Sequence, residues 1–561
     1  MDVQREVIGI CSDPDFRARI VELVLKLCEV DTCPAQPLES LAANEARAFA
    51  ILQAALSGLG LEGGRTVRRE ISPAIRAHPA YSTPYYSAAP HESVYQGRGN
   101  LLYLLDREPA MAGLGAAVNA HIDTVTPHIP PALGERFIAG RGTADDKGNV
   151  AAVIGALQIL AELERRNAVA LKNKLTVMFA VDEETGGNGS LDLAMDRVLR
   201  TRYSSILIME CTGNRLHPAN RGAVYLRCEA RFAPSTPGGA PGACLAEAYA
   251  WALLALLDEG EAIRGESAHP LFPHRPVQTC TGILGPFGGH PSAICGEVQF
   301  ELACFEPPKQ EDLRALVEHG VRRYVARYGD KTLVLDPSTG RKKVEKHYDL
   351  DRLSAGRWLV TIHGSTGHMG SLPLNDAAIA KWSYVVRELV QARQAGQVQF
   401  SLVLPPAGAG PSLVFEGAQG FLPTHSIQEV KARTREAFLS GIRAYLAEAG
   451  LPGDVIACEV TFDKLHNDAF AGDPDSTSMQ RARRTAVELG LPGAENPPVG
   501  WDVSCDARLF AGEYPDLPVI TFGAGKLEQA HSSAERLDID ELFEAICFTA
   551  LFLLRETGST S

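Results

Sequence analysis

The sequence has few of the features that mark membrane, secreted or nucleic-acid-binding proteins. Its 561 residues contain no apolar run of membrane-spanning length. The first residues, MDVQREVIGICSDPDF, carry acidic groups and no long apolar core, so we expect no signal peptide. The formal net charge is −14, and such a surplus of negative charge disfavours a nucleic-acid partner.

Closely spaced cysteine pairs are also missing. The twelve cysteines are scattered without a CxxC pair, and several, such as Cys28 and Cys547, lie in apolar surroundings. This usage predicts reduced, buried thiols and a cytoplasmic protein. The hydrophobic content of 45% is ordinary for a soluble chain, and the length predicts two or three domains.

What the sequence does contain is histidine and acidic residues where apolar strands end. His121 and Asp123 follow the apolar stretch 115–120. Because residues i and i+2 of a strand face the same side, the imidazole and the carboxylate emerge together. A carboxylate behind a ligating histidine fixes its tautomer and strengthens it as a donor. About twenty residues later a glycine-rich turn presents Asp145, which could bridge two metal ions.

A second strand, 174–180, runs into the acidic residues Asp182, Glu183 and Glu184. Adjacent acids at the end of a buried strand are costly unless a cation or solvent compensates them. We interpret Asp182, like Asp146, as a solvated group or a local hydrogen-bond acceptor.

Two more predicted strands, 205–209 and 517–522, lead to Glu210 and His531. Sites in open α/β sheets gather at the carboxyl ends of strands, so we expect all of these groups in one place. Two histidines and three carboxylates suit zinc, with cobalt or manganese as possible substitutes. Two such ions roughly 3.5–4 Å apart activate water and polarise a carbonyl group.

Four motifs carry a resemblance to a known family: HIDTV, GRGTADDKG, DEETGGNGS and GAGKLEQAHSSAE. They resemble the dinuclear zinc exopeptidases of the acetylornithine deacetylase, succinyl-diaminopimelate desuccinylase, aminoacylase, carnosinase and carboxypeptidase G family. The resemblance implies a metal held by His121, Asp145 and Glu210, and a second held by Asp145, Glu184 and His531. It further implies that Asp123 orients His121 and that Glu183 is the general base.

The pattern of elements predicts a mainly parallel α/β catalytic domain split in sequence, 1–222 and 451–561. Between these segments, an α+β lid domain is expected over 223–450. It reads as two β-α-β-β-α halves, 223–340 and 356–450, joined by a polar connector.

The second half of the expected lid contains GSTGHMGSLPLNDA, residues 364–377. This stretch resembles the lid motif of the family, which implies that His368 stabilises the oxyanion of a tetrahedral intermediate. The first half has no equivalent histidine after its first strand. We therefore expect His368 to act within its own chain, so that one chain is the catalytic unit, with further association left open.

Two other features allow more than one interpretation. Arg508, in a stretch similar to the Ser/Thr-Asp-Ala-Arg segment of the family, either binds a substrate carboxylate or pairs internally with Asp506. The insert at 72–96, rich in Pro, Tyr, Ser and His, is either functional or surface decoration. If it is functional, its tyrosines Tyr85, Tyr86 and Tyr95 could shape substrate access.

These observations favour a metal-dependent hydrolase that cleaves an amide bond near a free terminus. The doubled lid favours a dipeptidase or related exopeptidase, and an N-acyl amino-acid deacylase is the alternative. A non-catalytic peptide-binding relative would be favoured by loss of the base, a ligand or the lid histidine, and none is lost. The expected partner is a small peptide or N-acyl amino acid, with no nucleic acid and no membrane.

Overall fold

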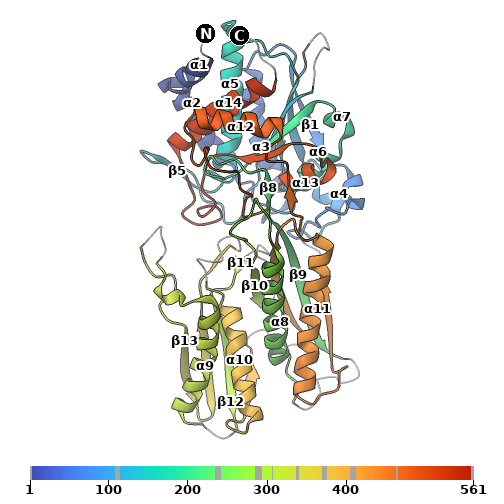
Figure 1. Cartoon of the computed structure of the whole chain (residues 1–561), viewed down its shortest axis with the longest axis vertical. Coiled ribbons are helices and arrows are strands. Elements are labelled where there is room, and N and C mark those ends of the chain that lie inside the picture. The colour runs from blue at the N-terminus through green and yellow to red at the C-terminus, as the bar shows by residue number, and fades with distance from the viewer. Residues whose placement is uncertain are drawn as a thin grey trace. The chain divides into compact units, whose positions relative to one another are not determined.

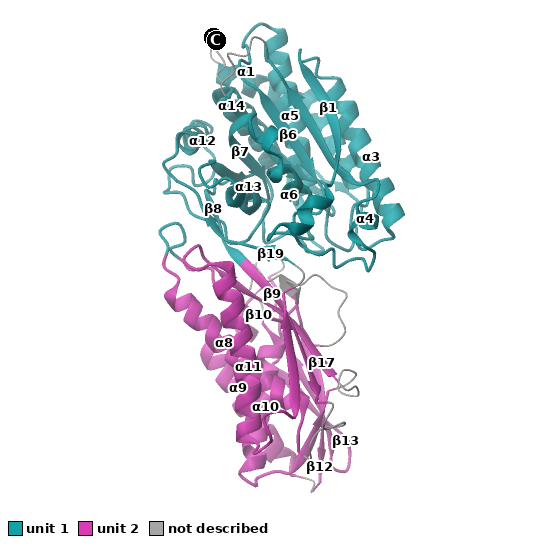
Figure 2. Cartoon of the chain, turned by 90° about the vertical axis from the view of Figure 1, so that its right-hand side faces the viewer, with its two compact units in different colours: residues 1–222, 269–273, 464–561 teal, residues 223–268, 274–463 magenta. Residues whose placement is uncertain are grey.

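The computed structural model describes residues 3–107, 114–233, 242–284, 293–305, 308–335, 340–368, 376–404, 412–462 and 465–557. The chain divides into two compact units (Figure 2). Unit 1 comprises Met1–Gly222, His269–Pro273 and Lys464–Ser561, and unit 2 comprises Ala223–Ala268 and His274–Asp463.

Unit 1 is built on a six-stranded sheet with the order β1-β2-β6-β3-β7-β21. Its first strand, β1, is labelled in Figure 1. Its strands are β1 (Gly64–Glu70), β2 (Gly99–Leu105), β3 (Gly115–His121), β6 (Leu175–Ala180), β7 (Tyr203–Met209) and β21 (Val519–Phe522). Strands β6, β3, β7 and β21 are parallel to one another, whereas β2 is antiparallel to both of its neighbours. This sheet is the mainly parallel one that the sequence predicts.

Helices cover this sheet and bury its central strands. Every residue of β2, β3 and β6 is buried, as expected of a sheet enclosed between layers of helices. Among the helices, α5 and α14 pack against each other, and α13 packs against β21 and α6. The helices of unit 1 are α1 (Val3–Cys11), α2 (Pro14–Cys28), α3 (Leu38–Ser57), α4 (His91–Val94), α5 (Lys147–Arg165), α6 (Asn188–Met195), α7 (Arg197–Arg200), α12 (Thr477–Glu488), α13 (Ala507–Glu513) and α14 (Ile539–Glu556).

Short strands and one 3-10 helix complete unit 1. They are η1 (Pro73–Ala77), β4 (Ala132–Leu133), β5 (Phe137–Ala139), β8 (Ala219–Asn220), β19 (His466–Asn467), β20 (Phe470–Ala471) and β22 (Arg536–Asp538). Strands β22, β5 and β4 form a small sheet of their own, which joins the chain after His531 to the segment before Asp145. Among the helices that the structure describes, none is long and apolar enough to cross a membrane.

Two sheets of unit 2 each contain a path of four strands, and the two paths have the same topology. One has the order β10-β17-β9-β18, and the other has the order β13-β14-β12-β16. The strands of the first are β9 (Gly222–Phe232), β10 (Thr279–Leu284), β17 (Ser412–Phe421) and β18 (Ile456–Thr461). Those of the second are β12 (Glu297–Cys304), β13 (Tyr348–Ser354), β14 (Arg357–His363) and β16 (Phe400–Val403). When the strands of each sheet are numbered in chain order, both sheets read 2-3-1-4, so the duplication is visible in the topology.

The two repeats are nested in the sequence. The first runs β9-α8-β10 and resumes as β17-α11-β18, and the second, β12-α9-β13-β14-α10-β16, lies between these parts. Figure 2 shows the strands of unit 2 on one side and its helices on the other. The helices are α8 (Leu245–Glu266), α9 (Gln310–Tyr328), α10 (Ala378–Gln394) and α11 (Ile427–Glu448); η2 (Lys331–Leu333), β11 (Ala293–Ile294) and β15 (Gly367–His368) are short elements.

The predicted division of the lid therefore needs two corrections. The halves 223–340 and 356–450 are not the structural repeats, because β17 returns to the sheet that β9 began and α11 packs against α8 of the same repeat. The start of the second catalytic segment at 451 is too early. Strand β18 pairs with β9 inside unit 2, and the chain re-enters unit 1 at Lys464.

Candidate metal centre

Every metal ligand implied by the sequence lies in unit 1, near the carboxyl ends of its parallel strands. His121 ends β3, Glu183 and Glu184 follow β6, Glu210 follows β7, His531 lies beyond β21, and Asp145 precedes α5. These ends meet at one edge of the sheet, where α/β proteins place their sites. The structure thus brings together residues that are more than 400 positions apart in the sequence.

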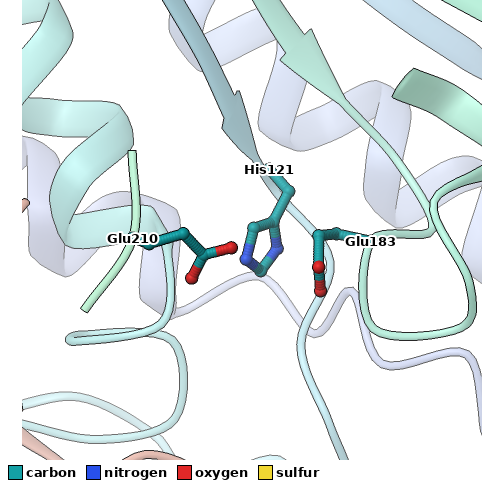
Figure 3. A group of neighbouring side chains, drawn as sticks. All are labelled: His121, Glu183 and Glu210. Atoms are coloured by element: carbon teal, nitrogen blue, oxygen red, sulfur yellow. The ribbon is translucent and has the colours of Figure 1, made fainter. Parts of the chain in front are cut away.

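One group of ligand atoms surrounds His121. Its imidazole lies between the carboxylates of Glu183 and Glu210, and the ligand atoms of all three lie within 4.8 Å of one another (Figure 3). Asp145 reaches the same imidazole, with its Oδ1 3.1 Å from His121 Nε2. Asp145 also falls within 4.8 Å of Glu210 and Cys211.

A second group lies on the other side of Asp145. The ligand atoms of Asp145, Glu184 and His531 are within 4.8 Å of one another. His531 Nε2 is 3.0 Å from Glu184 Oε2 and 3.2 Å from Asp145 Oδ2. Asp145 therefore turns one oxygen toward His121 and the other toward His531. This is the arrangement of a carboxylate that can bridge two ions.

The electrostatics of the cluster fit divalent cations. Burial, together with the Asp145 carboxylate, raises the pKa of Glu210 well above its usual range. Burial also raises the pKa of Glu184. The two histidines are thus not enough to compensate the negative charge gathered here. Oxygen and nitrogen donors in this number suit zinc and similar ions, so the residues present fit a pair of metals.

The histidines respond to the same charges in the opposite sense. Burial disfavours the charged form of His121, but hydrogen bonds to Asp123 and Asp145 outweigh it and raise the pKa of His121 well above its usual value. The pKa of Asp145 is lowered, because hydrogen bonds from His121 and His531 outweigh its own burial. Protons and metal ions would therefore compete for the same atoms.

Asp123 does more than the sequence indicates. Its Oδ1 is 3.4 Å from His121 Nδ1, which lies 3.1 Å from the main-chain oxygen of Asp123, and the orienting role of Asp123 stays a prediction. Its carboxylate also accepts hydrogen bonds from the main-chain amides of Glu183, at 3.1 Å, and Glu184, at 3.0 Å. The side chain is fully buried. One carboxylate thus links the β3 end of the site to the turn that follows β6.

Glu535 is a residue that the sequence reasoning missed. Its Oε1 accepts hydrogen bonds from the amides of Gly142, at 2.9 Å, Ala144, at 3.2 Å, and Asp145, at 3.3 Å, while Oε2 pairs with Arg141. Burial raises the pKa of Glu535 to about 7, even with the Arg141 guanidinium alongside. Glu535 thus ties the His531 segment to the Asp145 turn, across about 390 positions of the sequence.

The side chains of Asp146 and Lys147, next to Asp145, are buried and form hydrogen bonds within unit 1. Asp146 accepts a hydrogen bond from the His121 amide at 3.2 Å and from Asn149 Nδ2 at 2.8 Å, so it is a local acceptor and not a solvated group. The Lys147 ammonium donates to the carbonyl of Val30 at 2.6 Å. Burial lowers the pKa of Lys147.

Arg508 is buried close to the turn that carries Glu183. Its Nη1 donates to the carbonyl of Cys505 at 2.6 Å, and its Nη2 donates to that of Gly186 at 3.0 Å. The Asp506 carboxylate is 4.0 Å away, in the internal ion pair considered from the sequence. Both terminal nitrogens of Arg508 thus contact main-chain carbonyls, which supports the turn; a substrate role for Arg508 stays a prediction.

His368 lies in unit 2. The structure describes its backbone, which pairs with Ala293 between the short strands β15 and β11. Its side chain and residues 369–375 lie outside the described part of the chain, so the expected oxyanion role stays a prediction.

The strand ends of this α/β sheet gather two histidine–carboxylate groups around a shared aspartate, an arrangement that could hold two metal ions. A family model described as peptidase family M20/M25/M40 matches residues 117–555. This match covers well over half of the chain, so the chain belongs to that family.

Curated relatives match over a short part of the sequence. A probable carboxypeptidase of Arthroderma otae is 31% identical over 138 residues, which are 23% of this chain and 29% of the relative. A probable carboxypeptidase of Neosartorya fischeri is 35% identical over 130 residues, 21% of this chain and 28% of the relative. The matched part thus spans less than a third of these relatives.

Solved structures match over almost the whole chain at low sequence identity. A dipeptidase from Saccharomyces cerevisiae is 15% identical with a TM-score of 0.56, over 100% of this chain and 98% of that one. Human carnosine dipeptidase 1 is 14% identical with a TM-score of 0.55, over 99% of both chains. At these identities the likeness shows a shared fold.

Proposed function

We propose that this protein is a two-metal-dependent exopeptidase that hydrolyses an amide bond near a free terminus. The observation that carries the proposal is the Asp145 carboxylate, with one oxygen 3.1 Å from His121 and the other 3.2 Å from His531. Two ions held on either side of it would activate water and polarise the substrate carbonyl. Membership of peptidase family M20/M25/M40 supports the same class of reaction.

The ligand assignment draws on the groups of neighbouring atoms but keeps Glu183, which lies in one group with His121 and Glu210, as the base. His121, Asp145 and Glu210 hold one ion, and Asp145, Glu184 and His531 hold the other. Nitrogen and carboxylate donors favour zinc, with cobalt or manganese as substitutes. Asp123 keeps the His121 ring in place and fixes the amides of Glu183 and Glu184.

Glu183 is proposed as the general base. It is the less buried of the two glutamates, because Glu184 is buried and Glu183 is partly exposed. Burial and the nearby Asp506 carboxylate raise its pKa, and a base with a raised pKa holds a proton more readily near neutral pH. Glu183 takes the proton from water and passes it to the leaving amine. His368 is proposed to stabilise the oxyanion.

The second part of the proposal concerns the chemical class of the substrate. The names of the relatives, carboxypeptidase and dipeptidase, describe enzymes that act at a chain terminus. A small peptide with a free terminus is therefore the proposed substrate, in the cytoplasm and with one chain as the catalytic unit. An N-acyl amino-acid deacylase, which breaks the same kind of bond, is the second candidate.

A substrate screen tests the proposal. Purified protein is loaded with zinc, cobalt or manganese and offered dipeptides, C-terminally blocked and N-terminally blocked peptides, and N-acyl amino acids. Metal-dependent release of an amino acid from unblocked peptides is expected. Cleavage of acyl amino acids alone would assign a deacylase. A metal-loaded protein that binds peptides without cleaving any of them would overturn the enzyme proposal in favour of a binding protein.

A further inference from the structure

The turn that carries Glu183 and Glu184 begins at a residue in an unusual conformation. Asp182 has φ +62, in the left-handed region that residues with a side chain rarely adopt. Its carbonyl accepts a hydrogen bond from the Gly187 amide at 2.6 Å, which closes the turn. Such a backbone persists only where the surroundings hold it.

The Asp182 side chain is held by three donors behind the turn. Its Oδ2 accepts hydrogen bonds from the hydroxyls of Tyr95, at 2.6 Å, and Tyr86, at 2.8 Å. Its Oδ1 accepts from Arg98 Nη2 at 2.5 Å. Both tyrosines belong to the insert at 72–96. The Asp182 carboxylate, 1% exposed, thus depends on the insert for two of these three hydrogen bonds.

Arg98 cannot compensate Asp182 alone, because it is shared with a second acid. Its Nε and Nη2 contact the two oxygens of Glu45 at 2.9 and 2.6 Å, and its Nη1 donates to the Tyr86 hydroxyl at 2.8 Å. Arg98 and Glu45 are both fully or almost fully buried. One cation thus faces two carboxylates, and a buried charge without enough donors is costly. The tyrosine hydroxyls supply the missing donors.

The insert also contacts the far end of the same turn. The amide of Ser82 donates to Asn188 Oδ1 at 3.1 Å, and Asn188 Nδ2 donates to the Ser82 carbonyl at 2.7 Å and to the Tyr95 hydroxyl at 2.8 Å. A Cβ at Gly186 would lie 2.3 Å from the Ser82 side chain, so the two segments are in close contact. The insert therefore forms hydrogen bonds at both ends of the turn, to Asp182 and to Asn188.

We propose that Tyr86 and Tyr95 are positioning residues: through Asp182 they fix the turn that presents Glu183 and Glu184. The inference rests on the function proposed above for these two glutamates. It assigns the 72–96 insert a role behind the site, because these two hydroxyls bind Asp182 and are not the groups that meet a substrate.

The experiment compares Tyr86→Phe, Tyr95→Phe and the double variant with the wild type. Tyr81→Phe is the matched control, because it removes the same atom from the same insert, where the Tyr81 hydroxyl bonds to His91 Nδ1 at 3.0 Å. The readouts are amide hydrogen exchange of peptides covering 181–190, zinc content, kcat and KM. Loss of a buried hydrogen bond to a charged group changes an equilibrium about tenfold or more.

In the double variant we expect exchange across 182–187 to rise about tenfold or more, with kcat falling by a similar factor and KM within about twofold. Tyr81→Phe should match the wild type in all readouts. Unchanged exchange and kcat in the double variant would overturn the proposal, as would an equal loss in Tyr81→Phe. If the wild type cleaves no substrate, the proposed function fails, but the exchange measurement still decides whether the tyrosines hold the turn.

Discussion

At the scale of single residues, the proposed function gives two neighbouring glutamates different roles, and their surroundings differ. Glu184 is buried and contacts His531 at 3.0 Å, whereas Glu183 is partly exposed. Both main-chain amides are held by the same Asp123 carboxylate. Because adjacent side chains diverge, we propose that fixing this one backbone segment directs the Glu184 carboxylate to a metal and leaves that of Glu183 for proton transfer.

Replacement of Glu183 by Gln tests the different roles proposed for Glu183 and Glu184. We expect kcat to fall by about 10²–10⁴-fold, the usual contribution of a general base, while both metals stay bound. Steady-state kinetics and metal analysis of the same preparation check this. Glu184→Gln, the matched variant one residue on, should instead lose metal. Wild-type turnover in Glu183→Gln would show that the base is another group.

Glu535 acts on the site without belonging to the ligand set. Glu535→Ala removes the acceptor for three amides of the Asp145 turn. Metal affinity should fall by about 10–100-fold, as for other groups that orient ligands. Competition with a chelator measures this, and Glu528→Gln, an exposed position before His531, is the control. Equal affinities in Glu535→Ala and the wild type would contradict this role.

At the scale of secondary-structure elements, the strands and their ends were the predictable part. The apolar runs before His121, Asp182 and Glu210 are each followed at once by an ionisable residue, so a short stretch of sequence contains the whole signal. The parallel sheet then brings these ends together. The expected position of the proposed metal ligands follows from these local patterns and from the general behaviour of α/β sheets.

The hydrogen bonds that support the site were not predictable in the same way. Glu535 contacts Gly142 across 393 positions, and Tyr86 contacts Asp182 across 96. A glutamate or tyrosine in a loop gives no local sign of such a partner. The nested order of the unit 2 repeats was not predicted for the same reason. Strand β17 is assigned to its repeat by its pairing with β10 and not by its own sequence pattern.

The buried side chain of His217, beside β21, should make the free energy of unfolding depend on pH. His217 pairs by its main chain with Thr521, and its Nδ1 donates to the Val499 carbonyl at 2.9 Å. Burial lowers the pKa of His217 from 6.5 to about 4. The unfolded chain therefore takes up a proton first as the pH falls. The contribution to stability is fully present above pH 6.5 and is lost between pH 6.5 and 4.

The predicted loss is about 3 kcal/mol in the free energy of unfolding across this window. Urea unfolding of the wild type and of His217→Gln at a series of pH values measures it. In His217→Gln, the free energy of unfolding should not show this fall between pH 6.5 and 4. Parallel pH profiles for the two proteins would mean that His217 titrates normally in the folded state.

At the scale of the whole molecule, unit 2 carries two copies of one topology in one chain. Only the inner repeat contains the His368 stretch, since β15 lies between β14 and α10. We propose that this histidine serves the site of its own chain. A mixture of Glu183→Gln and His368→Ala copies should then stay inactive, because no chain has both groups. Recovery of activity on mixing would show that the histidine comes from a second chain.

The bridging role of Asp145 is tested most directly by counting metals. Mass spectrometry of protein purified without chelators should find about two ions per chain in the wild type. About one should remain in His531→Ala, and Asp145→Ala should lose both, because each group of ligands uses one of its oxygens. A wild type with one ion, unaffected by Asp145→Ala, would contradict a shared aspartate at the centre of the site.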